Sequence, residues 1–136
     1  MANYPIQDVE GIGPTYGQKL QDAGIKDTDT LLKTCCVPGG RKEIAEKTGI
    51  DAGQILKWTN MADLYRIKGV GSEYAELLEA AGVDTVKELK HRVPANLTTK
   101  MTEVNESRKL VRSLPSESIV SGWVEQAKGM DAMIEH

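Results

Sequence analysis

The chain has 136 residues, of which 40% are hydrophobic and 27% charged, as is usual for a globular protein and unusual for a disordered one. There is no phenylalanine and aromatic residues make up only 4%, so we expect an aliphatic core and a helical fold. The formal charge of -3 excludes a strong overall attraction to nucleic acid, which depends on neutralising phosphates.

The cysteines and the first residues indicate where the protein resides. Cys35 and Cys36 are adjacent, and neighbouring cysteines rarely form a disulfide of good geometry. Two adjacent cysteines without further ligands also do not match a zinc site. Residues 1–5 lack the basic and apolar regions of a signal peptide, and no apolar run approaches the roughly 20 residues of a membrane span. The sequence therefore predicts a reduced, cytoplasmic protein without a metal ion, a cofactor or a membrane.

The first predicted unit, residues 1–62, opens with a glycine-rich turn. Ile6 and Val9 have the spacing of one helix face, and the sequence Gly-Ile-Gly follows at 11–13. Because glycine tolerates the backbone of a helix end, a short helix is expected to end here and another to cover residues 15–23. Asp27 or Thr28 is expected to cap the next helix.

The rest of the first unit is predicted as a turn and two helices. Residues 38–40, Pro-Gly-Gly, predict a flexible turn, and Arg41 with Lys42 is expected to be a solvated basic pair. Binding of an anion at the start of the next helix is the alternative. Helices are expected over residues 41–47 and 52–64, and the join to the next unit is expected within the second of these.

The second predicted unit, residues 63–136, repeats the first at an offset of 58 residues. Its first helix is expected over residues 73–81. A capping box of Thr85 with Glu88 is expected to start the next helix, and two more helices are expected over residues 97–114 and 118–130. Arg108, Lys109 and Arg112 form one basic stretch, which we expect on a solvated helix face; an extension of a nucleic-acid surface is the alternative. We expect the two units to pack as one compact domain. Equivalent aromatic residues, Tyr16 with Tyr74 and Trp58 with Trp123, are expected to pack against the core.

Both units carry one pattern, apolar-x-x-apolar-x-Gly-apolar-Gly-x-x-x-small-x-x-apolar. It consists of Ile6, Val9, Gly11, Ile12, Gly13, Gly17 and Leu20 in the first copy, and of Leu64, Ile67, Gly69, Val70, Gly71, Ala75 and Leu78 in the second.

This pattern resembles the helix-hairpin-helix family, and the whole chain resembles a bacterial family of unknown function built from paired helix-hairpin-helix units. The resemblance implies an all-α fold, a SAM-domain-like or helix-hairpin-helix bundle of two tandem repeats. It also implies sequence-independent binding of duplex DNA, in which hairpin amides at a helix start hold phosphate oxygens and nearby basic residues add affinity. The residues implied are Gly11, Ile12, Gly13, Lys19, Arg66, Lys68, Gly69, Val70 and Gly71.

Other functions remain open from the sequence. Glu10 precedes the first Gly-x-Gly, and Glu73, Glu76 and Glu79 follow the second, where they would repel phosphates. A protein-interaction or scaffold domain with purely structural hairpins is therefore the alternative, and a small-ligand pocket between the repeats is a third possibility. No arrangement of histidine, cysteine, serine or carboxylates fills catalytic roles, so we expect no enzyme.

Overall fold

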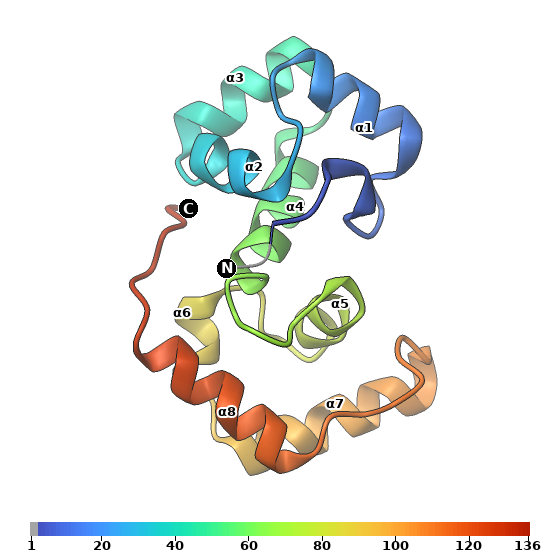
Figure 1. Cartoon of the computed structure of the whole chain (residues 1–136), viewed down its shortest axis with the longest axis vertical. Helices are drawn as coiled ribbons and strands as arrows, with labels where there is room; N and C mark the ends of the chain where they lie inside the picture. Colours follow the sequence, from blue (N-terminus) through green and yellow to red (C-terminus); the bar gives the residue numbers. More distant parts are fainter. Residues whose placement is uncertain (1–2) are drawn as a thin grey trace. The chain divides into compact units, whose positions relative to one another are not determined.

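The protein is all-helical: in the computed structural model, which describes residues 3–136, every named element is a helix (Figure 1). Met1 and Ala2, the first residues of the predicted 1–62 unit, lie outside the described residues. The described chain forms two compact units, an N-terminal unit of residues 3–63 with Met133–His136 and a C-terminal unit of Leu64–Ala132. Within residues 3–136, no helix is both long enough and apolar enough to cross a membrane.

The N-terminal unit begins with a short 3-10 helix that is fixed by main-chain pairing. The N–H of Ile6 donates to Lys26 O (3.0 Å), and the N–H of Thr28 donates to Tyr4 O (2.9 Å). The elements of this unit are η1 (Ile6–Asp8), α1 (Gly13–Asp22), α2 (Thr28–Cys35), α3 (Pro38–Thr48) and α4 (Ala52–Leu64), the last of which ends at the boundary.

Polar caps set the starts of the short helices in both units. Asp27 accepts a hydrogen bond from the N–H of Thr30 at 2.8 Å, and hydrogen bonding from the Thr30 side chain together with this main-chain bond lowers the pKa of the Asp27 carboxyl. The resulting stabilisation is present near neutral pH and is lost as the pH falls through that lowered pKa. Thr85 caps the corresponding helix of the other unit by accepting from the N–H of Glu88 (3.3 Å), which is one of the two bonds of the predicted capping box. The Glu88 carboxylate accepts from Nε of Arg92 (3.0 Å).

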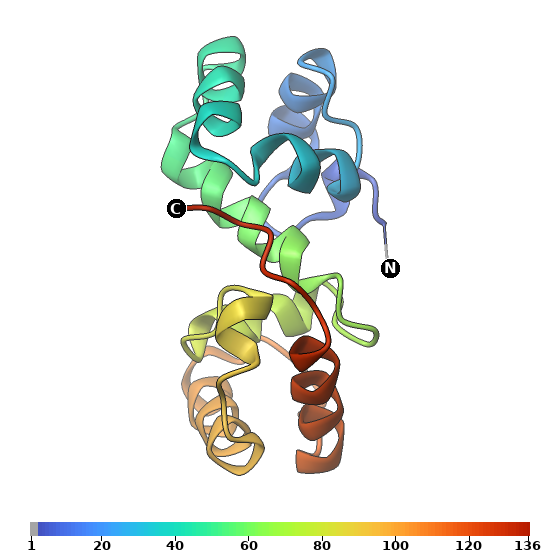
Figure 2. The ribbon, with the colours of Figure 1, turned by 90° about the vertical axis from the view of Figure 1, so that its left-hand side faces the viewer.

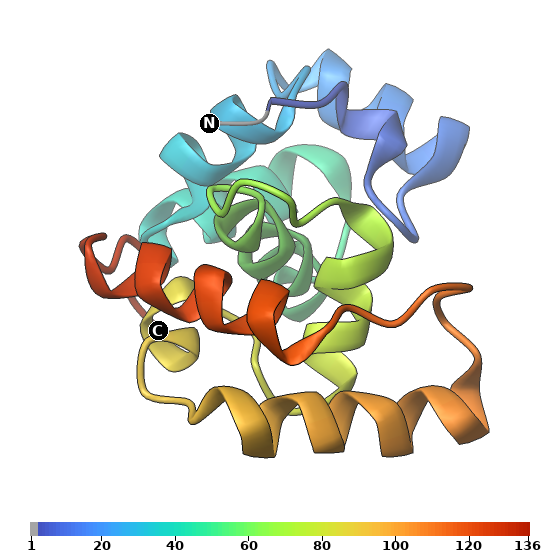
Figure 3. The same ribbon diagram turned by 60° about the horizontal axis from the view of Figure 1, so that its bottom comes forward.

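The C-terminal unit contains four helices, of which the last two pack closely together (Figure 3). Buried aliphatic side chains and Trp123 form its core. Its elements are α5 (Ser72–Ala80), α6 (Val86–Leu89), α7 (Pro94–Arg108) and α8 (Glu117–Lys128).

The connection between α7 and α8 differs from the prediction of one helix over 97–114. Helix α7 ends at Arg108, and Lys109 adopts a left-handed conformation with φ of +50°. The Asn105 side chain accepts from the N–H of Val111 (3.0 Å) and donates to its carbonyl (3.1 Å), so it holds the following loop in place. Arg112 therefore lies on a loop, and the predicted basic helix face that included it was wrong.

The start of α3 also differs from the prediction. Residues 38–40 form the first turn of α3 instead of a flexible turn, with Pro38 at the helix start, where its missing N–H is not needed. Gly40 lies against the carbonyl of Thr34, which a Cβ atom at this position would meet. Arg41 is only 5% exposed, so the prediction of a solvated basic pair was wrong for this residue.

The two cysteines differ in environment, and we expect them to differ in reactivity. Burial raises the pKa of the Cys35 thiol to about 11, whereas Cys36 is half-buried. Because the thiolate is the reactive form, Cys35 is expected to resist iodoacetamide at pH 8 while Cys36 is alkylated. Mass spectrometry of the native and the urea-denatured chain checks this. Equal labelling of both residues in the native chain would contradict it.

Candidate nucleic-acid interface

The first glycine turn, residues 9–13, leads into α1. Gly11 and Gly13 have φ of +89° and +63°, which favours glycine at both positions. Ile12 is 3% exposed, and its N–H donates to Val9 O at 3.0 Å. The amide of Ile12 is therefore engaged within the turn.

The second glycine turn, residues 67–71, leads into α5 and resembles the first only in part. Gly69 has φ of +96°, but Gly71 has φ of -100°, which other residues also adopt. Val70 is 2% exposed, and its N–H donates to Ile67 O at 3.1 Å. The side chains of Ile12 and Val70 thus pack beneath their turns, while Gly11 and Gly69 are exposed and Gly13 and Gly71 are half-buried.

Each glycine turn packs against the tryptophan of its own unit. A Cβ atom added to Gly11 would lie 3.6 Å from Nε1 of Trp58, and one added to Gly69 would lie 3.2 Å from Nε1 of Trp123. Both indoles are buried. The positive φ favours glycine at the first position of each turn, and at Gly69 the close indole disfavours a side chain as well, whereas the distance at Gly11 is that of an ordinary contact.

A tyrosine lies beside each tryptophan. The ring centroids of Tyr16 and Trp58 are 5.3 Å apart, as are those of Tyr74 and Trp123. Tyr16 is 42% exposed and lies at the surface, with Nζ of Lys19 6.0 Å from its ring centroid. Tyr74 is half-buried, and its hydroxyl donates to Ser113 O (3.0 Å), which joins α5 to the α7–α8 loop.

The second glycine turn is additionally fastened to α8. The Gln126 side chain accepts from the N–H of Lys68 (2.9 Å) and donates to the Lys68 carbonyl (3.2 Å). The N–H and the carbonyl of Lys68 are thus both hydrogen-bonded, which holds its backbone in place, while its side chain is exposed. Arg66 is half-buried, and its guanidinium donates to Asp131 O (2.9 Å).

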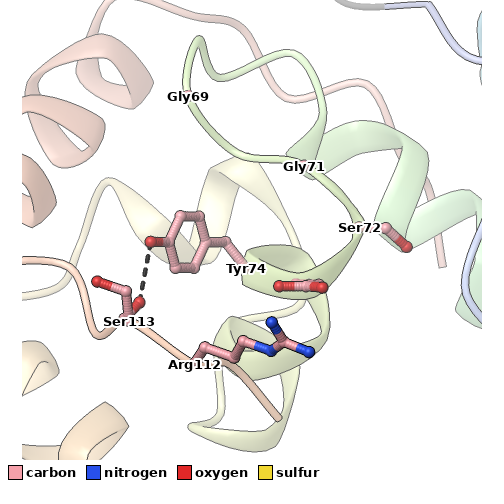
Figure 4. Close-up of a pocket in the computed structure, with 7 residues that line it drawn as sticks. Gly69, Gly71, Ser72, Tyr74, Arg112 and Ser113 are labelled. Atoms are coloured by element: carbon pink, nitrogen blue, oxygen red, sulfur yellow. Dashed lines mark hydrogen bonds between the residues drawn. The ribbon is translucent and has the colours of Figure 1, made fainter.

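An open depression of about 430 Å³ lies at the start of α5 (Figure 4). Gly71, the N-cap residue, offers no side chain to the first-turn N–H groups, and no proline replaces one of them, unlike at the starts of α3 and α7. Figure 4 shows the Arg112 side chain, carried by the α7–α8 loop, reaching the same depression below Tyr74. The lining residues are Gly69, Gly71, Ser72, Glu73, Tyr74, Arg112 and Ser113.

The depression combines two residues of the predicted set with Arg112, which the sequence offered only as a less favoured extension of a nucleic-acid surface, and with others that the sequence did not indicate. Gly69 and Gly71 belong to the predicted set, whereas Arg112 and Ser113 come from more than 35 residues further along the chain. Glu73 also lines the depression, so one carboxylate and one guanidinium face the same space. Of the other predicted residues, Gly11, Ile12, Gly13 and Lys19 belong to the N-terminal unit, whereas Arg66, Lys68 and Val70 belong to the C-terminal unit but do not line the depression.

Comparison with known proteins identifies one family. The family model described as "Domain of unknown function (DUF4332)" matches residues 10–130. No curated protein and no solved structure shows a significant match to the chain.

Proposed function

The chain belongs to the DUF4332 family, a domain of unknown function, and we propose that it is a non-enzymatic module that binds the DNA backbone without reading base sequence. In this proposal the two glycine turns are the hairpins of two tandem helix-hairpin-helix repeats. The depression at the start of α5 is its principal phosphate site, and it is the observation that carries the proposal.

The start of α5 supplies donors suited to a phosphate oxygen. The first N–H groups of an α-helix lack partners within the helix, and the helix dipole makes this end attractive to anions. Gly71 offers no side-chain cap, and no side chain at Gly69 or Gly71 keeps a ligand away from the main chain. These properties support contact with the backbone of a nucleic acid rather than with its bases.

Basic side chains supply the salt-dependent part of the affinity. Arg112 lines the depression, and Lys68 is exposed on the adjoining turn. Glu73 opposes them, and the chain is acidic overall, so the proposal predicts weak binding, in the micromolar range, at low salt. In the N-terminal unit, Lys19 in the last turn of α1, with its Nζ atom over the exposed Tyr16 ring, offers a second, smaller basic surface.

A protein partner is the second candidate, and a separate surface of the C-terminal unit favours it. Val93 is 57% exposed and Ile119 is 52% exposed. Val93 lines an open depression of about 500 Å³ together with residues at the start of α7 and along α8. Exposed apolar side chains beside a depression are typical of protein-interaction surfaces. DNA binding at the start of α5 and protein binding at this second surface would not exclude each other.

Replacing Arg112 with glutamate is expected to weaken duplex DNA binding by about tenfold or more, because the site loses a phosphate-binding cation and gains an anion. Fluorescence anisotropy of a labelled duplex, titrated at about 50 mM and about 200 mM salt, measures the effect and its salt dependence. Lys100→Glu is the matched control, since Lys100 is exposed on α7, does not line the depression, and gives the same change in net charge.

Two results would contradict the proposal. The first is an unchanged chain that does not bind duplex DNA even at the lower salt concentration. The second is equal weakening by Arg112→Glu and Lys100→Glu, which would mean that binding depends on net charge and not on the depression. In either case the exposed surface around Val93 and Ile119 becomes the place to search for a protein partner.

A further inference from the structure

Arg41 is a buried cation in α3 of the N-terminal unit, at a position where α7 of the C-terminal unit has a buried leucine. It is the fourth residue of α3, and its counterpart at the fourth position of α7 is Leu97; they are 5% and 2% exposed. Since leucine fills the equivalent position of the C-terminal unit, packing does not require a cation here. Burying a guanidinium is costly unless it is hydrogen-bonded, so the bonds of Arg41 indicate what it does.

Those bonds hold the main chain of the C-terminal segment. Nη1 of Arg41 donates to Cys35 O (2.8 Å), and Nη2 donates to Glu135 O (2.7 Å). The N–H of Glu135 in turn donates to Cys36 O (2.7 Å). Arg41, Cys35 and Cys36 thus form a clamp, here called the Arg41 clamp, that grips both main-chain groups of one residue. The Glu135 side chain stays exposed, so recognition depends on an extended backbone, as in other forms of main-chain recognition.

The gripped segment, Met133–His136, is separable from the helices before it. After α8 the chain carries no helix (Figure 2). The carbonyl of Met130 accepts from Nζ of Lys90 (2.7 Å) and that of Asp131 accepts from Arg66 (2.9 Å), so the C-terminal unit holds the chain up to this point. Only Ala132 lies between the last carbonyl held there and the segment that belongs to the N-terminal unit.

We propose that the Arg41 clamp is a receptor for the Met133–His136 segment of a second copy of this chain as well as for the chain's own segment, so that exchange of this segment links two copies. The same hydrogen bonds form in either case, which makes exchange of identical segments a low-cost route to dimers. If no segment occupies the clamp, the buried guanidinium loses the Glu135 carbonyl as an acceptor, and an unsatisfied buried donor costs free energy. The clamp is therefore expected to be occupied by the segment of one copy or the other.

A disulfide between two different chains, formed with oxidised glutathione as the oxidant, tests the exchange. The first chain carries Glu135→Cys with Cys36→Ser, so it has a thiol on the segment and none beside its own clamp. The second chain is unchanged and offers Cys36. Because Glu135 N and Cys36 O are 2.7 Å apart, ordinary bond lengths place the two residues within the Cα range of disulfides. Burial keeps the Cys35 thiol, with its pKa of about 11, out of the reaction.

The expected result is a mixed disulfide that forms at least about tenfold faster than with a collisional control, because docking raises the effective concentration of the thiol. The control chain carries Glu125→Cys with Cys36→Ser and so presents its thiol on the exposed surface of α8. Arg41→Leu in the second chain, which installs the residue of the sister helix, is expected to reduce the rate to that of the control.

Equal rates for the thiols at positions 135 and 125 would overturn the proposal. It would also be overturned if Arg41→Leu left the rate unchanged in a chain that keeps its helical circular dichroism. Should that variant fail to fold, the comparison of positions 135 and 125 decides by itself, since it leaves the clamp intact.

Discussion

Replacing Gly40 with alanine is expected to destabilise the N-terminal unit by about 3 kcal/mol, because the added Cβ atom meets the main-chain carbonyl of Thr34 and the two helices must move apart. The obstacle is backbone, which cannot rotate away as a flexible side chain would. Urea unfolding followed by Trp58 fluorescence measures the change, in a chain whose other tryptophan, Trp123, is replaced with phenylalanine.

Gly39→Ala is the matched control for this prediction. Gly39 is the preceding residue of the same helix, and an added Cβ atom there meets no atom within 4 Å. Alanine is the better helix former, so this substitution is expected to stabilise the unit by about 0.5–1 kcal/mol. Opposite signs at two adjacent glycines would support the close approach of α2 and α3. Similar small effects at both positions would contradict it.

Replacing Gly69 with alanine is expected to destabilise the C-terminal unit by about 2 kcal/mol, through backbone strain at a positive φ. The contact with Nε1 of Trp123, 3.2 Å from the added Cβ atom, opposes any relaxation. Unfolding followed by Trp123 fluorescence, in a Trp58→Phe chain, measures the effect.

Gly122→Ala is the control for this second prediction, since Gly122 is exposed within α8 and an added Cβ atom there meets nothing within 4 Å. It is expected to stabilise the unit by up to about 1 kcal/mol. A Gly69→Ala chain as stable as the unchanged protein would show that the turn adapts. If the predicted loss of stability is observed, a substitution of Gly69 would change folding as well as any DNA binding. DNA binding should therefore be tested with substitutions of Arg112 and Lys68.

The features that the sequence predicted well are the local ones. Helix starts at Thr85 and helix ends near Gly24 and Gly82 depend on residues within a few positions of one another. The helix over 52–64 also follows from its own residues and is confirmed by α4 (Ala52–Leu64). The all-helical fold was predictable from composition and periodicity for the same reason.

The features that the sequence missed depend on contacts between distant residues. Arg41 is buried because the carbonyls of Cys35 and Glu135 accept its hydrogen bonds, and its neighbours in sequence carry no sign of this. Helix α7 ends early, at Arg108, and the C-cap residue Lys109 is neither glycine nor proline, so the predicted helix continued past the true end. Because the helix ends there, Arg112 lies on the following loop, from which it lines the depression at the start of α5.

The most direct test of the proposed phosphate site is to titrate the 15N-labelled protein with a short duplex DNA and to follow its amide resonances. The account predicts that the largest shifts fall on Gly71, Ser72 and Glu73 at the start of α5, with a smaller set around Gly11 and Lys19. It also predicts that the shifts at α5 fade as salt is raised. Shifts confined to other surfaces, with the amides of residues 69–74 unmoved at saturating DNA, would contradict it.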